Sequence, residues 1–519
     1  MHLAWTDRLA PPHPAPMRNR PENHLFYGDN LAVLRKEIAD ESVDLIYLDP
    51  PFNSNATYGI LFKEPDGRAS NAQIEAFEDS WHWNDSAEEA FDQVARSGNT
   101  KAFDLLNAMC GFLGDNDMMA YLAMMAVRLL ELHRVLKPTG SLYLHCDPTA
   151  SHYLKLLLDG VFGHKAYRNE IVWDYSFRLM DLPHFFNRKH DVILFYGKSA
   201  GSRFAMPKTP WTRSELLASR RQAVHVDEAG VEWIWMPGGK GHSKNKLRRI
   251  DDILAGGKAM SDVWPMPILS SSSKERFGYP TQKPVALLER IIAASSREGD
   301  VVLDPFCGCG TAVHAAQKLG RQWIGIDVTH LAISLIEKRM RDAFPAVMFS
   351  VEGTPTDLAS ARDLALRDKY QFQWWAVSLV DALPFGGRKK GADGGIDGLI
   401  YFNDHDVTAG KMVTHRAIVS VKGGLNPDVA MVETLAATIA REKAPIGVLI
   451  MNARPTREME RRAAAVGIYR AGVDETFPRL QILTLADLFQ GKRPRIPNVD
   501  RAAFRRAARE ATGTQPGLL

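Results

Sequence analysis

The sequence predicts an α/β protein built around a doubly wound, mostly parallel sheet. Residues 43–48 and 301–303 are short apolar runs with the length of buried strands. Residues 118–136 carry apolar side chains every three to four positions, which is the spacing of an amphipathic helix. Strands that alternate with helices indicate parallel pairing, because each connecting helix must cross a face of the sheet.

The elements of this sheet are expected in two blocks of sequence, residues 24–160 and residues 281–345. Between a predicted helix and a predicted strand, the stretch Lys137-Pro138-Thr139-Gly140 should end the helix. Strands are predicted at 25–27, 43–48, 141–146, 301–303 and 323–326, and helices at 30–38, 118–136, 284–294, 312–319 and 329–339.

Shifts in composition predict the domain boundaries. Residues 1–23, rich in Pro and His, are expected to form a disordered lead-in rather than a signal peptide. The first α/β domain should span 24–350, with a recognition region inserted at about 165–265, where helical periodicity is weak. A Thr, Pro, Ser and Asp-rich stretch at 351–361 predicts a linker, and 362–519 has the size of a second domain with a basic tail.

The composition is that of a globular protein without a membrane anchor. Of 519 residues, 45% are hydrophobic and 24% are charged, and no run of about 18 apolar residues occurs. Only four cysteines are present, which favours a reducing, cytoplasmic compartment. The net charge is only +3, but basic residues cluster at 240–249 and after Gly491. Such patches suit contact with phosphate groups, although a solvated helix face would have the same composition.

A glycine-containing turn follows the predicted strand that ends at Asp304, and the next strand ends at Asp327. A carboxylate at the end of the second strand is where ribose hydroxyls would be held. An acidic residue at the start of the loop suits a cationic sulfonium and an amino group better than a pyrophosphate, and S-adenosylmethionine carries both. Cys307 and Cys309 lie in this turn, and without a second Cys/His pair nearby they favour a tight turn over a metal site.

The stretch Asp49-Pro50-Pro51-Phe52 directly follows the predicted strand at 43–48. An exocyclic amine on a base is a poor nucleophile, because its lone pair is delocalised into the ring. The Asp49 carboxylate and the Pro50 carbonyl can accept hydrogen bonds from such an NH2 group while charge develops on its nitrogen. Proline stiffens the loop, and Phe52 can stack on a base that has left the duplex. A Pro-Pro turn at a strand end would look the same in isolation.

In this order the two loops resemble the amino-group DNA methyltransferases of the permuted (beta) class, in which the catalytic loop precedes the cofactor loop. Residues 27–30, 136–141 and 280–284 resemble further motifs of that family, and the likeness covers about 24–345. It implies catalysis by Asp49, Pro50, Pro51 and Phe52. It also implies contacts to S-adenosylmethionine from Asp29, Gln282, Lys283, Pro284, Asp304, Phe306, Gly308, Gly310, Thr311 and Asp327.

The resemblance implies methyl transfer to N6 of adenine in a specific double-stranded DNA sequence, in bacterial restriction-modification or phage defence. It further implies a cytoplasmic protein that can form a homodimer. Aspartate as the first residue of the catalytic loop favours adenine, but cytosine-N4 methylation stays open. A DNA-binding or sensing protein that no longer turns over is the alternative from another class. RNA methylation is disfavoured by the large insert, and cytosine-C5 chemistry by the lack of a Pro-Cys motif.

The predicted second domain has Asp397 at the start of one strand and Lys422 at the end of the next. This arrangement resembles the PD-(D/E)xK nucleases of the Mrr branch and implies a restriction-endonuclease-like α/β domain with Mg2+ at Asp397. Ser420 stands where that family has Glu or Gln, and serine is a weak metal ligand. Glu433, on the following predicted helix, could supply a displaced carboxylate. The alternative is a domain that only binds DNA.

Overall fold

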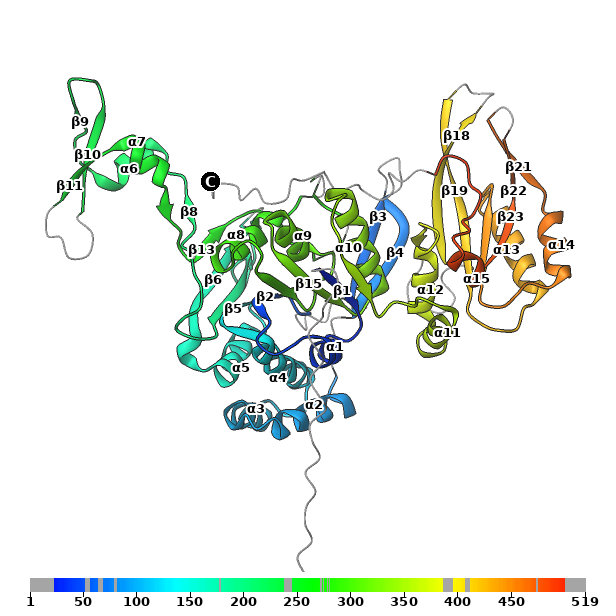
Figure 1. The fold of residues 1–519 in the computed structure, drawn as a ribbon, viewed down its shortest axis with the longest axis horizontal. Coiled ribbons are helices and arrows are strands. Elements are labelled where there is room, and N and C mark those ends of the chain that lie inside the picture. The colour runs from blue at the N-terminus through cyan, green and yellow to red at the C-terminus, as the bar shows by residue number, and fades with distance from the viewer. Residues whose placement is uncertain are drawn as a thin grey trace, which may run out of the picture.

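The chain forms a central α/β domain with a projecting arm on one side and a C-terminal domain on the other (Figure 1). In the view of Figure 1 the arm is green and the C-terminal domain runs from yellow to red. The computed structural model describes residues 23–51, 57–63, 69–78, 82–176, 179–237, 245–270, 273, 275–277, 279, 281–385, 395–406, 411–472 and 475–499.

A nine-stranded sheet forms the central domain, in the order β13-β6-β7-β5-β2-β14-β15-β1-β16. Every neighbouring pair is parallel except those of β7, which runs antiparallel to β5 and β6. The prediction of a mostly parallel sheet is therefore confirmed. Its strands are β1 (His24–Tyr27), β2 (Val43–Leu48), β5 (Leu136–Cys146), β6 (Tyr167–Asp174), β7 (His190–Gly197), β13 (Val263–Pro265), β14 (Val301–Asp304), β15 (Gln322–Asp327) and β16 (Ser350–Glu352).

Alternate side chains of each strand point into two hydrophobic cores, as the two-residue period of a strand requires. Ile46 and Leu48 belong to one core, and Leu45 and Tyr47 belong to the other. The first core is covered by helices α1 (Asn30–Glu37), α2 (Asp85–Arg96), α3 (Thr100–Leu113), α4 (Asp117–Val135) and α5 (Ser151–Phe162). The second is covered by α8 (Val285–Ser295), α9 (Thr311–Lys318) and α10 (His330–Ala343).

Some elements differ from the sequence-based expectation. Helix α4 ends at Val135, so that Lys137-Pro138-Thr139-Gly140 lies inside strand β5 instead of forming a turn. Two further strands, β3 (Thr57–Lys63) and β4 (Ala69–Glu78), pair with each other and were not predicted. A short 3-10 helix, η1 (His164–Ala166), leads into β6.

The inserted region is smaller than predicted, because β6, β7 and β13 join the main sheet. Residues 208–237 and 245–259, called the arm below, project from the sheet edge and pack around their own small core of Leu216, Ile234, Ile250 and Ile253 (Figure 1). The arm contains β8 (Lys208–Thr209), α6 (Arg213–Arg220), β9 (His225–Val226), β10 (Glu232–Met236), β11 (Lys246–Arg249), α7 (Ile250–Gly256) and β12 (Lys258–Ala259).

The C-terminal domain has a five-stranded mixed sheet in the order β17-β18-β19-β20-β23. Its strands are β17 (Leu383–Pro384), β18 (Gly398–Asp406), β19 (Lys411–Lys422), β20 (Gly447–Met451) and β23 (Leu480–Thr484), with a separate pair β21 (Ile468–Ala471) and β22 (Glu475–Pro478). Its helices are α11 (Leu358–Arg367), α12 (Lys369–Ser378), α13 (Val429–Arg441), α14 (Arg457–Ala465) and α15 (Leu485–Phe489).

The two domains meet along α10 and α12 rather than through a free linker. Within the predicted linker 351–361, Val351 and Glu352 are the last residues of β16, and α11 begins at Leu358. Leu331 of α10 and Trp374 of α12 lie in one hydrophobic core cluster. The backbone N–H of His330 donates a buried hydrogen bond of 3.2 Å to the Gln371 side-chain carbonyl. Among the helices that the structure describes, none has the length and apolar composition needed to cross a bilayer.

Candidate active site

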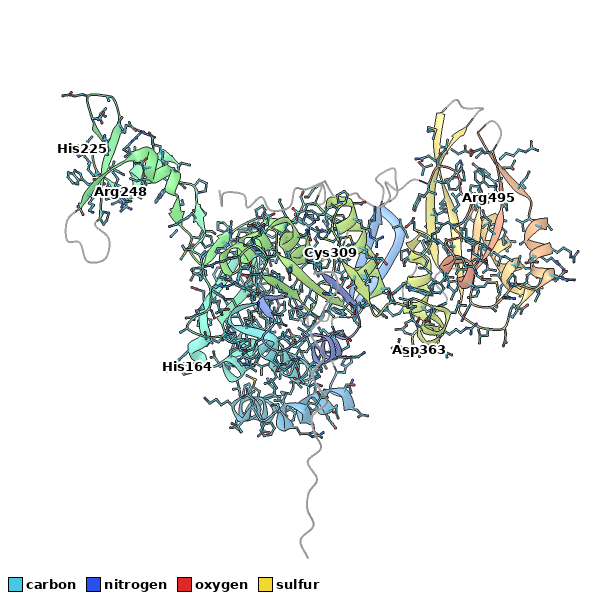
Figure 2. All side chains as sticks on the ribbon, viewed as in Figure 1. His164, His225, Arg248, Cys309, Asp363 and Arg495 are labelled. Atoms are coloured by element: carbon cyan, nitrogen blue, oxygen red, sulfur yellow. The ribbon has the colours of Figure 1, made fainter. Side chains whose placement is uncertain are left out.

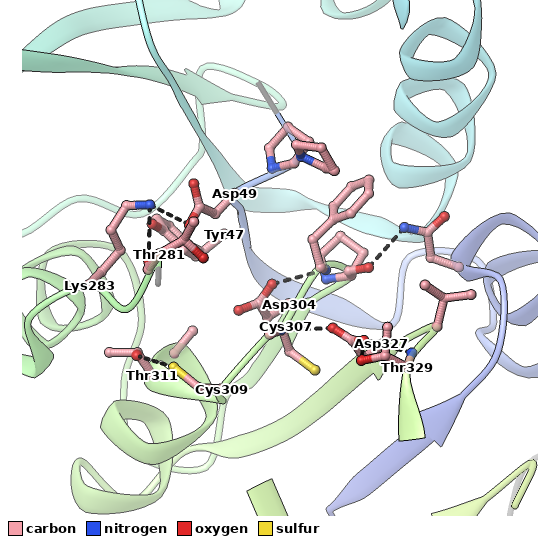
Figure 3. Close-up of a pocket in the computed structure, with 18 of the residues that line it drawn as sticks. Tyr47, Asp49, Thr281, Lys283, Asp304, Cys307, Cys309, Thr311, Asp327 and Thr329 are labelled. Atoms are coloured by element: carbon pink, nitrogen blue, oxygen red, sulfur yellow. Dashed lines mark hydrogen bonds and ion pairs between the residues drawn. The ribbon is translucent and has the colours of Figure 1, made fainter. Parts of the chain in front are cut away.

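A cavity of about 390 Å³ opens where β2, β14 and β15 end side by side. Ligands of open α/β sheets bind at the carboxyl ends of the strands, and small-molecule sites occupy roughly 300–1,000 Å³. Figure 3 shows Asp49, Lys283, Asp304 and Asp327 around this cavity. Of the predicted site residues, the following line it: Asp29, Asp49, Pro50, Pro51, Gln282, Lys283, Asp304, Phe306, Gly308, Thr311 and Asp327. Phe52 lies outside the described residues.

The Asp49 carboxylate is held from one side only. Its Oδ2 atom accepts a hydrogen bond of 2.6 Å from the Lys283 ammonium group, and both side chains are largely buried. The other oxygen, Oδ1, is buried and has no hydrogen-bond partner among the described residues. A buried acceptor without a partner is costly, so a ligand with an N–H group in this cavity would be stabilised there.

The cofactor loop depends on two glycines. Gly308 has φ +49° and Gly310 has φ +74°, a region that favours glycine. A Cβ atom at Gly310 would lie 2.7 Å from Ile336 Cγ1 of α10, so that position also leaves no space for a side chain. Gly310 does not line the cavity. It shapes the turn and allows α9 to begin at Thr311.

Asp327 closes the loop from the end of β15. Its Oδ2 accepts the Gly308 N–H at 2.9 Å, and its Oδ1 accepts the N–H and hydroxyl of Thr329, both at 2.8 Å. Burial raises the pKa of Asp327 to about 6 in spite of these bonds. The predicted place for ribose hydroxyls is thus a carboxylate that already orders the loop, with lone pairs left for further donors.

Asp304 is buried at the end of β14 and accepts the Phe306 N–H at 3.1 Å. Burial raises the pKa of Asp304 well above its usual range, and repulsion by Asp49 and Asp327 adds to the rise. Four carboxylates therefore face one cavity, those of Asp29, Asp49, Asp304 and Asp327, and the lining cations are Lys283 and Arg128. A cationic ligand would relieve their mutual repulsion, which fits the predicted sulfonium and amino groups.

Sequence reasoning missed two arginines, one partly buried and one fully buried, that form hydrogen bonds with residues lining the cavity. Arg128 of α4 donates to Asp29 and to Asn30, both at 2.6 Å, and Asn30 in turn donates to the Pro305 carbonyl at 2.9 Å. Asp29 also caps α1 by accepting the Ala32 N–H at 3.0 Å. This set of bonds ties the first turn of the domain to the cofactor loop.

The second missed arginine is Arg339 of α10, which is 1% exposed. It donates to the Cys309 carbonyl at 3.1 Å and to the Thr311 hydroxyl at 3.4 Å, and it lies over the Phe277 ring. Cys307 and Cys309 are buried free thiols whose pKa values burial raises. The described residues contain no group of three or more His, Cys, Asp or Glu side chains suited to a metal.

The predicted closing segment lies over the cavity. The Gln282 amide accepts the Phe277 N–H and donates to the Glu275 carbonyl, both at 2.7 Å, so it holds the segment together. Lys283 points to Asp49, as described above. Pro284 does not line the cavity but precedes the first residue of α8.

Beneath the catalytic loop runs a chain of hydrogen bonds. The Tyr47 hydroxyl and His145 Nδ1 are 2.9 Å apart, and His145 Nε2 is 3.0 Å from Asp191. The Tyr175 hydroxyl donates to the same aspartate at 2.9 Å, and Asp191 keeps a lowered pKa because these bonds outweigh its burial. Tyr47 lines the cavity, so the chain fixes the strand from which Asp49 extends.

Most of the first domain matches one protein family. The N6 and N4 methyltransferase family, described as DNA methylase, matches residues 43–338. The chain belongs to this DNA methylase family.

Relatives of this DNA methylase are similar over about three fifths of the chain. The type II methyltransferase M.EcaI of Enterobacter cloacae is 26% identical, covering 62% of this chain and 69% of that protein. The DNA adenine methyltransferase YhdJ of Escherichia coli K12 is 27% identical, covering 61% and 82%. A solved DNA modification methylase of Thermus thermophilus, complexed with S-adenosyl-L-methionine, aligns over 64% of this chain and 99% of that one, with 17% identity and a TM-score of 0.35.

The C-terminal domain of the methylase has a second cavity, of about 690 Å³, lined by both Asp397 and Lys422. The strand positions predicted for these two residues are confirmed: Asp397 directly precedes β18, and Lys422 ends β19. Glu433 does not line this cavity. It is 56% exposed on α13 and forms an ion pair of 3.1 Å with Arg462.

The expected Mg2+ does not fit the donors that the described residues offer here. Asp397 is the single carboxylate among the described lining residues. Its Oδ1 accepts a bond from the Gln373 amide, and its Oδ2 accepts the Val421 N–H at 2.6 Å and the Ser420 hydroxyl at 3.2 Å. Magnesium needs several free hard oxygen ligands, and this carboxylate is already committed to the protein.

Proposed function

We propose that the methylase transfers a methyl group from S-adenosylmethionine to the exocyclic N6 of adenine in double-stranded DNA. The observation that carries this proposal is the buried Oδ1 of Asp49, which has no hydrogen-bond partner within the described part of the chain. Asp49 lines the same cavity as Asp304 and Asp327. An amino group placed there would find its acceptor beside the carboxylates suited to a cationic cofactor.

In this proposal one group of residues holds the cofactor, and Asp49 contacts the amino group of the base. Asp304, Asp327 and the turn at Gly308 would hold the cofactor, which supplies an electrophilic methyl group on a positively charged sulfur. Asp49 accepts an N–H of the amino group and orients its nitrogen lone pair toward that methyl. The N–C bond forms as the C–S bond breaks, and the nitrogen then releases a proton. Lys283 holds the Asp49 carboxylate in place throughout.

We further propose that the arm contacts the DNA duplex. All four residues of β11 are exposed, and three of them are basic: Lys246, Arg248 and Arg249. Trp235 on the neighbouring strand is 44% exposed. Arg248 and His225 lie on this projecting module in Figure 2. Such a basic strand can follow phosphate groups or enter a groove, which supports the placement of target recognition in the arm.

The chain order of the two loops supports the permuted class. Asp49 of the catalytic loop precedes Asp304 of the cofactor loop in the sequence.

The deciding experiment incubates purified protein with S-adenosylmethionine and unmethylated DNA, followed by mass spectrometry of the nucleosides. We expect N6-methyladenine with wild type and at least about a 100-fold loss of rate with Asp49→Ala. Asp92→Asn, on the surface of α2, is the matched control and should keep full activity. N4-methylcytosine would preserve the site chemistry and change the base. No methylated base in varied DNA would contradict the proposal.

Metal-dependent cleavage by the C-terminal domain stays a prediction from the sequence, as do the homodimer and the restriction-modification setting. Nicking of plasmid DNA with Mg2+ or Mn2+ tests the first of these. A nuclease centred on Asp397 and Lys422 would lose nicking in Lys422→Ala and keep it in Asp49→Ala. Nicking that persists in Lys422→Ala would rule out that centre.

A further inference from the structure

We propose that the C-terminal cavity is a metal-independent site for phosphate groups of the DNA backbone. It lies outside the methyl-transfer site and uses different residues. The proposal starts from the mismatch between the predicted metal site and the donors present.

Asp397 acts as an anchor rather than as a free ligand. It is 9% exposed, and its two oxygens accept bonds from Gln373 of α12 and from Ser420 and Val421 of β19. The carboxylate thus fixes a helix and a strand on either side of the cavity. These neutral donors leave the carboxylate its single negative charge, which the cations that line the cavity outnumber.

The cavity is lined by three cations from three different elements. Arg362 comes from α11, Lys369 from α12 and Lys422 from the end of β19. Within the part of the chain that the structure describes, none of the three forms an ion pair. Three positive side chains against one engaged carboxylate leave an excess of positive charge. Phosphate groups are the anions that such clusters of Lys and Arg bind.

The wall of the cavity also permits close approach. Gly423 and Gly424 follow Lys422, and a Cβ at Gly424 would meet no atom within 4 Å. At the rim, Leu366 is 88% exposed and Leu425 is 59% exposed, so the opening faces solvent. A long polymer can therefore lie across the opening with one phosphate between the three cations, which an enclosed pocket would not allow.

The family and the junction between the domains favour DNA as the molecule that supplies this phosphate group. The family acts on DNA, and α12 connects the two cavities: Gln371 bonds to His330 next to the cofactor loop, while Gln373 bonds to Asp397. A duplex engaged by the central domain would meet a second group of cations at a fixed position on the same molecule. A free nucleotide carries the same chemistry and must be distinguished by experiment.

The test measures binding of a fluorescent, non-specific duplex to the full-length protein in EDTA across a range of salt concentrations. Lys369→Gln/Lys422→Gln should reduce the slope of log K against log salt by about 0.9 for each phosphate that the protein no longer neutralises. Lys411→Gln/Lys443→Gln removes equal charge from the same domain, and Lys411 lies at the other end of β19. This control should keep the wild-type slope. Unchanged thermal unfolding followed by circular dichroism verifies that both variants are folded.

Three outcomes would overturn the proposal. Equal slopes for the test variant and the control would show that the cavity does not contact the backbone. Metal-dependent nicking that disappears in Lys422→Ala would make the cavity a nuclease centre. Binding of AMP that requires Lys369 and Lys422, with an unchanged duplex slope, would assign the cavity to a small phosphate ligand instead of DNA.

Discussion

At the scale of single residues, three of the aspartates that line the cavity differ in how many hydrogen bonds they accept. Asp327 accepts one hydrogen bond from Gly308 of the cofactor loop and two from Thr329, and Asp304 accepts one from Phe306. One buried oxygen of Asp49 has no hydrogen-bond partner among the described residues. Burial raises the pKa of both Asp304 and Asp327. Placing several ionised carboxylates in one buried cavity costs free energy, and a positively charged ligand would offset that cost.

S-adenosylmethionine should accordingly bind more weakly as pH falls through about 6, the pKa of Asp327. A cation binds best to the ionised carboxylate, so below this pH binding must also release a proton. Isothermal titration from pH 7.5 to pH 5 would measure this as a dissociation constant that rises up to about tenfold per pH unit below 6. Asp327→Asn should bind weakly but with a flatter pH profile. A wild-type profile as flat as that of the variant would contradict the assignment.

At the scale of elements, the turn between β14 and α9 is held by its backbone conformation and by α10 behind it. Gly310→Ala should lower the free energy of unfolding by about 1–3 kcal/mol, because it combines a positive φ with a clash against Ile336. Urea unfolding would measure the change. Gly111→Ala is the control: it lies in α3, meets no atom within 4 Å, and should be neutral or stabilising. An unchanged stability in Gly310→Ala would disprove the argument.

Arg339 braces the same turn from α10. Arg339→Met keeps much of the buried volume but removes the bonds to the Cys309 carbonyl and the Thr311 hydroxyl. Bonds from a charged donor contribute about 1.5–3 kcal/mol, so we expect S-adenosylmethionine affinity to fall roughly 10- to 100-fold. Arg341→Met, an exposed arginine on the same helix, should bind normally. Equal affinities for the two variants would count against this role.

These elements also show what the sequence could and could not predict. A strand and the turn that follows it are consecutive in the sequence, so the loops at Asp49 and Asp304 can be predicted from the sequence alone. Arg128, Arg339 and the chain from Tyr47 through His145 to Asp191 reach the site from elements far apart in sequence. The positions of these residues in the sequence follow neither the helix period nor the strand period, so no sequence pattern marks them as site residues. Residues 169–173 and 190–195 resemble strands that flank the insert, but the sequence does not show that β6 and β7 join the main sheet, because their pairing partners are distant in the chain.

At the scale of the whole molecule, the junction of the two domains lies directly behind the cofactor loop. His330 stacks on Tyr27 with ring centroids 3.6 Å apart, and its backbone bonds to Gln371. Burial lowers the pKa of His330 to about 3, which favours a neutral ring stacked on Tyr27. The hydrophobic cluster around Leu331 and Trp374 continues across this boundary.

Cofactor binding should therefore stabilise both domains. At about 100 times its dissociation constant, a ligand adds about 2.7 kcal/mol to the free energy of unfolding. Hydrogen exchange measured by mass spectrometry should show slower exchange in β15 and also in α12 when S-adenosylmethionine is present. Helix α14, at the outer end of the C-terminal domain in Figure 1, is the internal control. Protection confined to the central domain would show that the junction does not transmit the effect.

The shared helix α12 has a consequence for how this chain can be divided. Cutting between β16 and α11 would expose Leu331 and remove Gln371, the hydrogen-bond partner of the His330 backbone. The fragment that matches the family, residues 43–338, would then expose an apolar surface that is buried in the intact protein. Such a surface promotes aggregation. A gene trimmed to that signature would encode a poorer enzyme than the fused one. We therefore expect the joined pair of domains to be the unit that should be expressed together.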